Sequence, residues 1–416
     1  MEPLLEAIGQ QEEDLVGLCR RLIQIPSENP PGDVRELATF VAETLTAWGI
    51  APIWHEPAPG RANIVASIGP TDGKTLILNG HLDVVPAGKP GRWSHPPFAG
   101  DVSGGLLYGR GAVDMKGGVA ALMIAFRALA ATVLPGRIIL ALTADEETGG
   151  RWGTRWLVEH AGLHGDGALI AEPSGPGIAT IGQKGVLWLK VKSVGSAAHG
   201  SLSPYAGTNA ILRLTDALPV FTALAGRSGD FPDALRPILR RSKTRMAAAV
   251  GETAIQALDH VTVNIGTIRG GTKVNVVPDE AVAEIDIRVP LGCSAGAIRD
   301  EIEASLTARG LILEECTVSE PNYTEPEADV ARALARAVEV VAGQQPEFLL
   351  QWATSDARHF RAAGIPVVQY GPWGQGIHGD DEAVYIDHLT HCAKVYAILS
   401  HTFLAVPPRD APPVRP

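Results

Sequence analysis

The sequence predicts an α/β protein built on a mixed, mostly parallel sheet with helices on both faces. Three short apolar runs, TLILNGH, RIILALTA and ALIAEP, are bounded by glycine and polar residues, as strands buried on both faces are. Helical patterns near residues 117–131 and 154–160 alternate with these runs. Because alternating strands and helices form parallel sheets covered on both sides, this order predicts the first domain.

A second kind of pattern begins near residue 186. Four segments alternate apolar and polar residues, as strands with one solvated face do: VLWLKVKSV, VTVNIGTI, AVAEIDIRV and ILEECTV. Helical patterns near residues 208–224 and 294–309 lie among them. We therefore expect a four-stranded antiparallel sheet with two helices, inserted into the first domain.

The expected domain organisation follows from these two hydrophobic patterns. The first domain is expected to occupy residues 1–182 and 324–406, and the inserted domain residues 183–323. Within the insertion, residues 226–258 are expected to form a helical or irregular excursion without catalytic groups. The Pro-rich end, residues 407–416, is expected to be an unstructured tail.

Composition narrows the class of protein. With 45% hydrophobic and 19% charged residues, the 416-residue chain is long and apolar enough for two folded domains. The net charge is −11, and the basic residues form no stripe interleaved with aromatics. Nucleic acid and anionic membranes are therefore not expected as partners.

The chain's compartment is expected to be the cytoplasm. Its four cysteines are far apart and form no CxxC pair, which favours reduced thiols over a disulfide framework. The amino-terminal segment lacks the basic and apolar regions of a signal peptide. The most apolar run, residues 118–136, contains Arg127 and ends at a proline, so we interpret it as a buried helix and not a membrane span.

Metal-binding side chains follow the predicted strands. His81 and Asp83 end the first run, Asp145, Glu146 and Glu147 follow the second, and Glu172 ends the third. Asp114, in the Gly-rich segment YGRGAVDMKGG, and His378, in GIHGDDE, are further candidates. Open α/β sheets place their ligands at the carboxyl ends of the strands, so these residues are expected to form one hydrolytic metal centre.

The spacing of His81 and Asp83 suits a metal-bound imidazole. In an extended segment the two side chains point the same way, and a carboxylate commonly holds the second ring nitrogen of a ligand histidine. Taken alone, each candidate has an ordinary alternative. Asp114 is compatible with a turn, and Glu146 and Glu147 with a solvated helix start.

The combination is more informative than its members. Adjacent carboxylates disfavour joint ionisation unless a cation compensates, so one acid of the Glu146–Glu147 pair is interpreted as a ligand and the other as a proton acceptor. Five candidate ligands exceed the four of one structural zinc and include too many carboxylates for a thiolate site. Two ions sharing a bridging carboxylate fit better.

With these residues in place, the chain resembles the dinuclear zinc amidohydrolases that include acetylornithine deacetylase, succinyl-diaminopimelate desuccinylase, glutamate carboxypeptidase and aminoacylase. The resemblance covers nearly the whole chain in the family's order: GHLDVVP, YGRGAVDMKGG, TADEETGG, AEPSG, GSAAHGS, NVVPDE, DIRVP and HGDDE.

The resemblance implies roles for the site residues. Asp114 would bridge two divalent ions, His81 and Glu172 would complete one site, and Glu147 and His378 the other. Glu146 would be the general base and Asp83 the partner of His81. The ions are expected to be Zn²⁺, although Mn²⁺ and Co²⁺ accept the same ligands.

The resemblance also makes the insertion a lid and dimerisation domain. His199 would stabilise the oxyanion in a neighbouring subunit's site, and Asn275 and Arg288 would bind the substrate carboxylate. Each residue has an ordinary alternative: His199 as an exposed loop residue, Asn275 as a turn cap, and Arg288 as the partner of a surface acid. A homodimer through this domain is expected.

One departure from the family concerns the substrate. The segment QWATSDAR has Trp352 where small residues are common, and Trp373 precedes His378. Either tryptophan is compatible with ordinary core packing or with a pocket wall for a bulky or aromatic substrate.

The sequence thus predicts a metal-dependent hydrolase of amide-type C–N bonds in small carboxylate-bearing molecules, such as N-acyl amino acids or small peptides. Two alternatives remain open. One is an aminohydrolase that releases ammonia from an aromatic amine, and the other is a noncatalytic binding protein on the same fold.

Overall fold

The computed structural model describes residues 2–406, so the predicted tail at 407–416 lies outside the described residues. The chain forms two compact units. The second consists of Gly182–Tyr323 and Leu349–Thr354, and the first contains the remaining described residues. The assignment of catalytic and lid roles to these parts of the chain stays a prediction.

The first unit is built on a mixed sheet. Its strands follow the order β1 (Pro52–His55), β2 (Asn63–Ile68), β6 (Arg137–Thr143), β3 (Thr75–His81), β7 (Gly167–Ile170), β15 (Val367–Gln369) and β8 (Ile178–Gln183). The central strands β6, β3, β7 and β15 are parallel, and the outer pairs are antiparallel. The expected fold class is confirmed.

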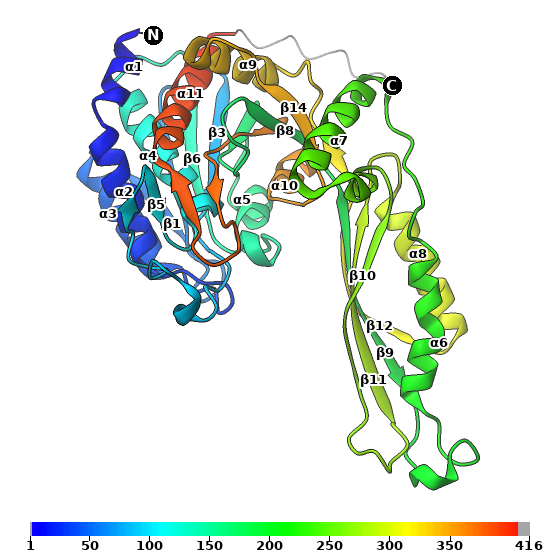
Figure 1. Ribbon diagram of the computed structural model, residues 1–416. Coiled ribbons are helices and arrows are strands. Elements are labelled where there is room, and N and C mark those ends of the chain that lie inside the picture. The colour runs from blue at the N-terminus through cyan, green and yellow to red at the C-terminus, as the bar shows by residue number, and fades with distance from the viewer. Residues whose placement is uncertain (1, 407–416) are drawn as a thin grey trace. The chain divides into compact units, whose positions relative to one another are not determined.

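Helices lie on both sides of this sheet (Figure 1). They are α1 (Glu2–Gly9), α2 (Glu12–Gln24), α3 (Arg35–Ala47), α4 (Gly117–Ala130), α5 (Thr154–His160), α9 (Asp329–Ala342), α10 (Ala357–Ala362) and α11 (Ile386–Ala405). The apolar run that contains Arg127 forms α4, which is almost entirely buried and packs against α11 and β3. Within residues 2–406, no helix combines the length and apolar character that a membrane span requires.

The second unit contains the expected antiparallel sheet. Its order is β10 (Thr262–Gly270), β11 (Glu280–Val289), β9 (Gly185–Val194) and β12 (Ile312–Ser319). Side chains of β9 and β11 alternate between buried and more exposed positions, because α6 (Ala210–Thr222) and α8 (Ala295–Ala308) cover one face. The excursion at 226–258 is largely helical and includes α7 (Arg236–Val250).

A small antiparallel sheet, not expected from the sequence, belongs to the first unit. It joins β16 (Gly374–Gln375), β17 (Ala383–Tyr385), β5 (Leu106–Tyr108) and β4 (Val102–Ser103). Pairing of β17 with β5 places the loop after β5, which contains Asp114, beside the loop before β17, which contains His378. The remaining short strands are β13 (Asn322–Tyr323) and β14 (Glu347–Gln351).

Candidate metal centre

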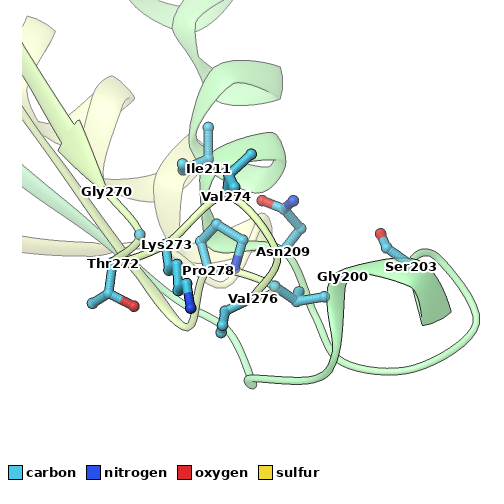
Figure 2. Close-up of a pocket in the computed structure, with 12 residues that line it drawn as sticks. Gly200, Ser203, Asn209, Ile211, Gly270, Thr272, Lys273, Val274, Val276 and Pro278 are labelled. Atoms are coloured by element: carbon cyan, nitrogen blue, oxygen red, sulfur yellow. The ribbon is translucent and has the colours of Figure 1, made fainter.

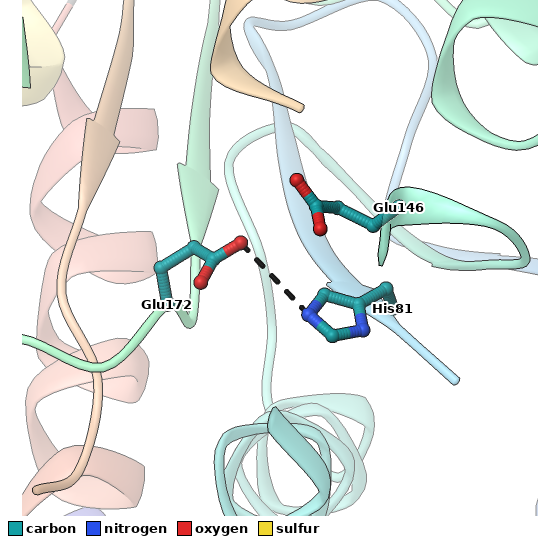
Figure 3. A group of neighbouring side chains, drawn as sticks. All are labelled: His81, Glu146 and Glu172. Carbon is teal, nitrogen blue, oxygen red and sulfur yellow. Dashed lines mark ion pairs between the residues drawn. The ribbon is translucent and has the colours of Figure 1, made fainter. Parts of the chain in front are cut away.

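Three neighbouring strands bring the first group of candidate residues together. His81 is the last residue of β3, and β3 pairs in parallel with both β6 and β7. Glu146 and Glu147 follow β6, and Glu172 follows β7. Because parallel strands end at the same edge of a sheet, these side chains meet there, as Figure 3 shows for His81, Glu146 and Glu172.

A tight turn after β6 presents the two adjacent glutamates. Asp145 is left-handed with a φ of 63°, and Glu146–Thr148 form a single 3₁₀ turn. The turn ends at two glycines, and a Cβ on Gly150 would lie 2.3 Å from Oδ1 of Asp356. Gly150 therefore allows the turn to pack directly on the TSDAR segment.

The loop that contains Asp114 approaches the same edge through glycine. A Cβ on Gly118, in the first turn of α4, would lie 2.4 Å from the carbonyl oxygen of Ala171, which immediately precedes Glu172. Substituting a larger residue there would separate the Asp114 loop from the end of β7. His378 itself lies in the loop between β16 and β17, in a left-handed conformation with a φ of 60°.

The carboxylate of Asp114 lies between two imidazoles. Its Oδ1 atom is 3.0 Å from Nε2 of His81, and its Oδ2 atom is 3.2 Å from Nε2 of His378. Each histidine also has a second carboxylate nearby. Glu172 Oε1 lies 4.0 Å from Nε2 of His81, and Glu147 Oε1 lies 3.6 Å from Nε2 of His378.

The electrostatics of the cluster favour cations. Burial, and then the charge of Asp114, raise the pKa of Glu172 to about 8. Burial, and then the charge of Glu172, raise the pKa of Glu146 well above its usual value. A hydrogen bond to Asp114, and then the Glu147 carboxylate 3.6 Å away, raise the pKa of His378 to about 10. In the metal-free chain the raised pKa values favour the protonated forms of Glu146, Glu172 and His378. A bound cation would supply the positive charge that stabilises the ionised carboxylates instead.

The donor set fits divalent metal ions. In each of two groups, one ligand atom per residue lies within 4.8 Å of the others: His81, Glu146 and Glu172 in one, and His81, Asp114 and Glu147 in the other. Oε1 of Glu147 is buried and has no hydrogen-bond partner within residues 2–406. A buried carboxylate oxygen without a partner is costly, and coordination of a cation would satisfy it.

Asp83 lies beside the imidazole of His81, and it also contacts the turn that contains the two glutamates. The nearest oxygen to Nδ1 of His81 is the main-chain carbonyl of Asp83, at 2.8 Å, whereas its carboxylate lies 3.5 Å away. The carboxylate instead accepts hydrogen bonds from the backbone N–H groups of Glu146 and Glu147. Asp83 thus contacts both the histidine and the glutamate turn.

The sequence analysis did not predict a buried ion pair that holds the loops of Asp114 and His378 in place. Arg110 donates to Oε2 of Glu382 at 2.5 Å, and both side chains are almost completely buried. Oε1 of Glu382 accepts the backbone N–H groups of Val113 and Asp114, while Arg110 donates to the carbonyl of Gly379. Arg110 belongs to the motif YGRG and Glu382 to the motif HGDDE, so both residues of the ion pair lie in motifs that the sequence analysis identified.

In the second unit, the structure brings His199 and Asn275 together. The N–H of Gly200 donates to the carbonyl oxygen of Asn275, and His199 pairs with Val276 in a β-bridge. Both His199 and Asn275 are exposed. Beside them lies a cavity of about 630 Å³, lined among others by Gly200, Asn209 and residues 270–274 and 276–278 (Figure 2).

The other two predicted substrate-binding residues also belong to the second unit. Arg288 pairs through Nε with Asp286 at 2.8 Å, and its Nη1 donates to Thr354, which is two residues from Trp352. This ion pair with Asp286 matches the alternative interpretation from the sequence, in which Arg288 pairs with a surface acid. Trp352 is 48% exposed, which does not fit burial in the core. Trp373, in the first unit, is 41% exposed.

A mixed sheet with imidazoles and carboxylates gathered at the carboxyl ends of its parallel strands is typical of metal-dependent hydrolases. Residues 77–401 match the model of peptidase family M20/M25/M40, and the chain belongs to this family. It is accordingly a metal-dependent hydrolase of amide-type C–N bonds in small molecules, and the noncatalytic alternative is set aside.

Individual relatives agree with this membership. The chain is 32% identical over 404 residues to a succinyl-diaminopimelate desuccinylase of Methylorubrum extorquens, covering 92% of this chain and 96% of the relative. An M20 family metallo-carboxypeptidase from Sulfolobus solfataricus shares the fold, with a TM-score of 0.81, 19% identity and coverage of 94% and 99%. A dinuclear metal-binding M20 peptidase of Bacillus subtilis has a TM-score of 0.64, 16% identity and coverage of 95% and 99%.

Proposed function

We propose that the chain removes an acyl group from an N-acyl amino acid, or a carboxyl-terminal residue from a small peptide, at a centre of two divalent ions. The observation that carries this proposal is the Asp114 carboxylate, whose two oxygens each lie beside a different histidine. A carboxylate in that position is suited to share its oxygens between two ions.

The proposed ligands divide into two sets by distance. His81, Asp114 Oδ1 and Glu172 form one set, and His378, Asp114 Oδ2 and Glu147 form the other. This division uses all five predicted ligands and leaves Glu146, which lies beside His81 and Glu172, without a ligand role. Zn²⁺ is the proposed ion, and Mn²⁺ or Co²⁺ would suit the same imidazole and carboxylate donors.

Bound ions would lower the pKa of a water molecule and polarise the scissile carbonyl. Glu146 accepts the proton of the attacking water and then delivers it to the departing amine. Its half-buried carboxylate lies at the carboxyl edge of the sheet, beside Glu172 and His81, as Figure 3 shows. A neutral amine leaves once the proton has been transferred.

Residues of the second unit would complete the site. Arg288 holds the substrate carboxylate, for which a guanidinium offers paired donors. Asn275 is proposed as a second carboxylate-binding residue, and His199 as the donor that stabilises charge on the carbonyl oxygen. His199 and Asn275 are neighbours on exposed loops, which supports a joint role.

We further propose a homodimer formed through the second unit, in which His199 of each chain serves the metal centre of the other. The exposed edge strands β10 and β12 support this assembly, because an unpaired strand edge is readily satisfied by a second copy. The cytoplasm is the proposed compartment, since all four cysteines are free thiols.

The substrate is proposed to carry a bulkier acyl group than an acetyl group. The Methylorubrum extorquens relative is named for a succinyl-diaminopimelate substrate, whereas Trp352 presents a half-exposed indole in this chain. An aromatic or long-chain acyl group would gain contact area on that ring.

A substrate panel tests this proposal. Metal-loaded protein is assayed with N-acetyl, N-succinyl and N-aromatic acyl amino acids, with dipeptides and with aromatic amines, and both released amine product and free ammonia are quantified. Release of a carboxylic acid and an amino acid supports the proposal. Ammonia release from an aromatic amine, without acyl release, would favour the aminohydrolase alternative.

A further inference from the structure

Asn29 lies at the junction between β3 and the turn that presents the two glutamates. Its side chain is 3% exposed, and its Nδ2 donates to Oδ2 of Asp83 at 2.8 Å and to Oγ1 of Thr148 at 3.0 Å. Asp83 follows β3, and Thr148 is the last residue of the glutamate turn. One amide group therefore joins the two segments that meet at the metal centre.

The backbone around Asn29 is firmly anchored. The N–H of Asn29 donates to the carbonyl of Val84, and the N–H of Val84 donates to the carbonyl of Ser27. The hydroxyl of Ser27 donates to the carbonyl of Leu82. Residues 27–29 thus pair with residues 82–84 through a short parallel bridge just after β3, and this pairing fixes the backbone from which the amide of Asn29 reaches Asp83.

The orientation of the amide follows from its neighbours. A carboxylate offers only acceptors, so the group that lies 2.8 Å from Oδ2 of Asp83 is the NH₂ of Asn29 and not its carbonyl. Turning the amide would place Oδ1 against a carboxylate. Oδ1 of Asn29 is buried and has no hydrogen-bond partner within residues 2–406. The amide therefore keeps its hydrogen bond to Asp83 although its own oxygen is left unsatisfied, which costs free energy.

Asp83 transmits this contact to Glu146. Its Oδ1 accepts the backbone N–H of Glu146 at 3.1 Å, and its Oδ2 accepts that of Glu147 at 3.2 Å. These are the first two N–H groups of the 3₁₀ turn, which have no partner within the turn itself. The position of the Asp83 carboxylate therefore fixes where the backbone of Glu146 lies.

We infer that Asn29 is a positioning residue for Glu146, acting through the Asp83 carboxylate and the hydroxyl of Thr148. The inference rests on the proposed role of Glu146 as general base. Loss of the Asn29 amide frees Asp83 and the turn, and Glu146 then occupies its proton-accepting position for a smaller fraction of the time. The turnover step is affected more than substrate binding, because a small misplacement of a reacting group chiefly lowers kcat.

A double-mutant cycle on the metal-loaded enzyme tests this inference. The four proteins are wild type, Asn29→Ala, Glu146→Gln and the double variant, each checked for metal content and Tm. We expect Asn29→Ala to lower kcat about tenfold with KM within about twofold. In the Glu146→Gln background, where the base is already absent, Asn29→Ala should cause no further loss of kcat.

Hydrogen exchange gives a readout independent of activity. Asn29→Ala should accelerate amide exchange in a peptide covering residues 144–150, because Asp83 no longer holds the two glutamate N–H groups in place. The matched control is Asn79→Ala. Asn79 is also a buried amide near the site, donates to Ala141 and has a partnerless Oδ1 within residues 2–406. Asn79→Ala is expected to lower Tm about as much as Asn29→Ala does, while its kcat stays within about twofold of the wild-type value.

Asn29→Asp covers the case in which Asn29→Ala does not fold. The substitution keeps the shape but replaces the donor by a second carboxylate beside Asp83, so kcat should fall at least as far as in Asn29→Ala. The inference is overturned if either Asn29 variant keeps wild-type kcat with both ions bound, or if Asn29→Ala lowers kcat equally in both Glu146 backgrounds. Full activity of Glu146→Gln itself would instead overturn the general-base proposal, and the inference with it.

Discussion

Nε2 of His378 lies 3.2 Å from Oδ2 of Asp114, although 264 residues separate the two along the chain. The contact arises because β17 pairs with β5, which sets the loops after β5 and before β17 side by side. The buried pair of Arg110 and Glu382 holds both loops by their backbones. The position of Asp114 beside His378 therefore depends on tertiary contacts between two segments that lie far apart along the chain.

Metal binding is expected to release protons. In the metal-free chain the pKa of Glu172 is about 8 and that of His378 about 10, so both groups retain a proton at pH 7. A cation at the site displaces these protons, because metal ligands must be deprotonated. Titration calorimetry with Zn²⁺ at pH 7, in buffers of different ionisation enthalpy, should show net release of more than one proton per chain.

Variants of these two proposed ligands provide the control for that titration. Glu172→Gln and His378→Gln should each reduce the number of protons released as well as the number of ions bound. Binding of two ions to the wild type with no net proton release would contradict the proposed ligand set.

Arg288→Ala should raise KM about tenfold or more for a substrate with a free carboxylate, and far less for the corresponding uncharged amide. The physical reason is the loss of a charge-assisted, paired hydrogen bond. The matched control is Arg227→Ala, which removes another Arg–carboxylate pair of the same unit, the one with Glu301. Equal losses for the acid and the amide substrate would show that Arg288 has only a structural role through Asp286.

Subunit mixing tests the proposed role of His199. Homodimers of His199→Ala and of Glu146→Gln should each be nearly inactive, since each site would lack one required group. Mixing them under conditions of subunit exchange should restore roughly a quarter of the sites, because half of the dimers are hybrids with one intact site each. Exchange is verified by native mass spectrometry, and exchange without recovery would place His199 in its own chain's site or outside catalysis.

Trp352→Ala should raise KM more for N-aromatic acyl substrates than for N-acetyl substrates, because only the former contact the indole over a large area. Trp54→Ala is a suitable control, since Trp54 is 40% exposed on β1, away from the TSDAR segment in sequence. A proportional change in KM for both substrate classes would remove Trp352 from the list of specificity-determining residues.

The sequence predicted the fold class because the two domains differ in hydrophobic pattern. Runs such as TLILNGH are apolar throughout and form central parallel strands, whereas VLWLKVKSV alternates and forms β9, with one covered face. Short elements such as β5 and β17 have three residues each, which is too little periodicity to recognise. They depend on their tertiary neighbours, and the small sheet was missed for that reason.

The candidate site was predictable where residue type and strand position coincide. His81 ends an apolar strand, Glu146 and Glu172 follow two others, and the structure gathers these three residues. The sequence around Asn29 does not indicate its proposed role, because an asparagine before two prolines is typical of an ordinary turn. Its contact with Asp83 requires the pairing of residues 27–29 with residues 82–84, which is a long-range backbone interaction.

The most direct test of the account is the comparison of Glu146→Gln with Glu147→Gln. Metal content is measured by elemental analysis and kcat by product release, with the same substrate for both variants. Glu147→Gln should lose bound metal together with activity, because it removes a proposed ligand.

Glu146→Gln should retain both ions and lose several orders of magnitude in kcat with little change in KM, since only proton transfer is removed. Near-wild-type kcat in Glu146→Gln with both ions bound would contradict the assignment of Glu146 as the general base.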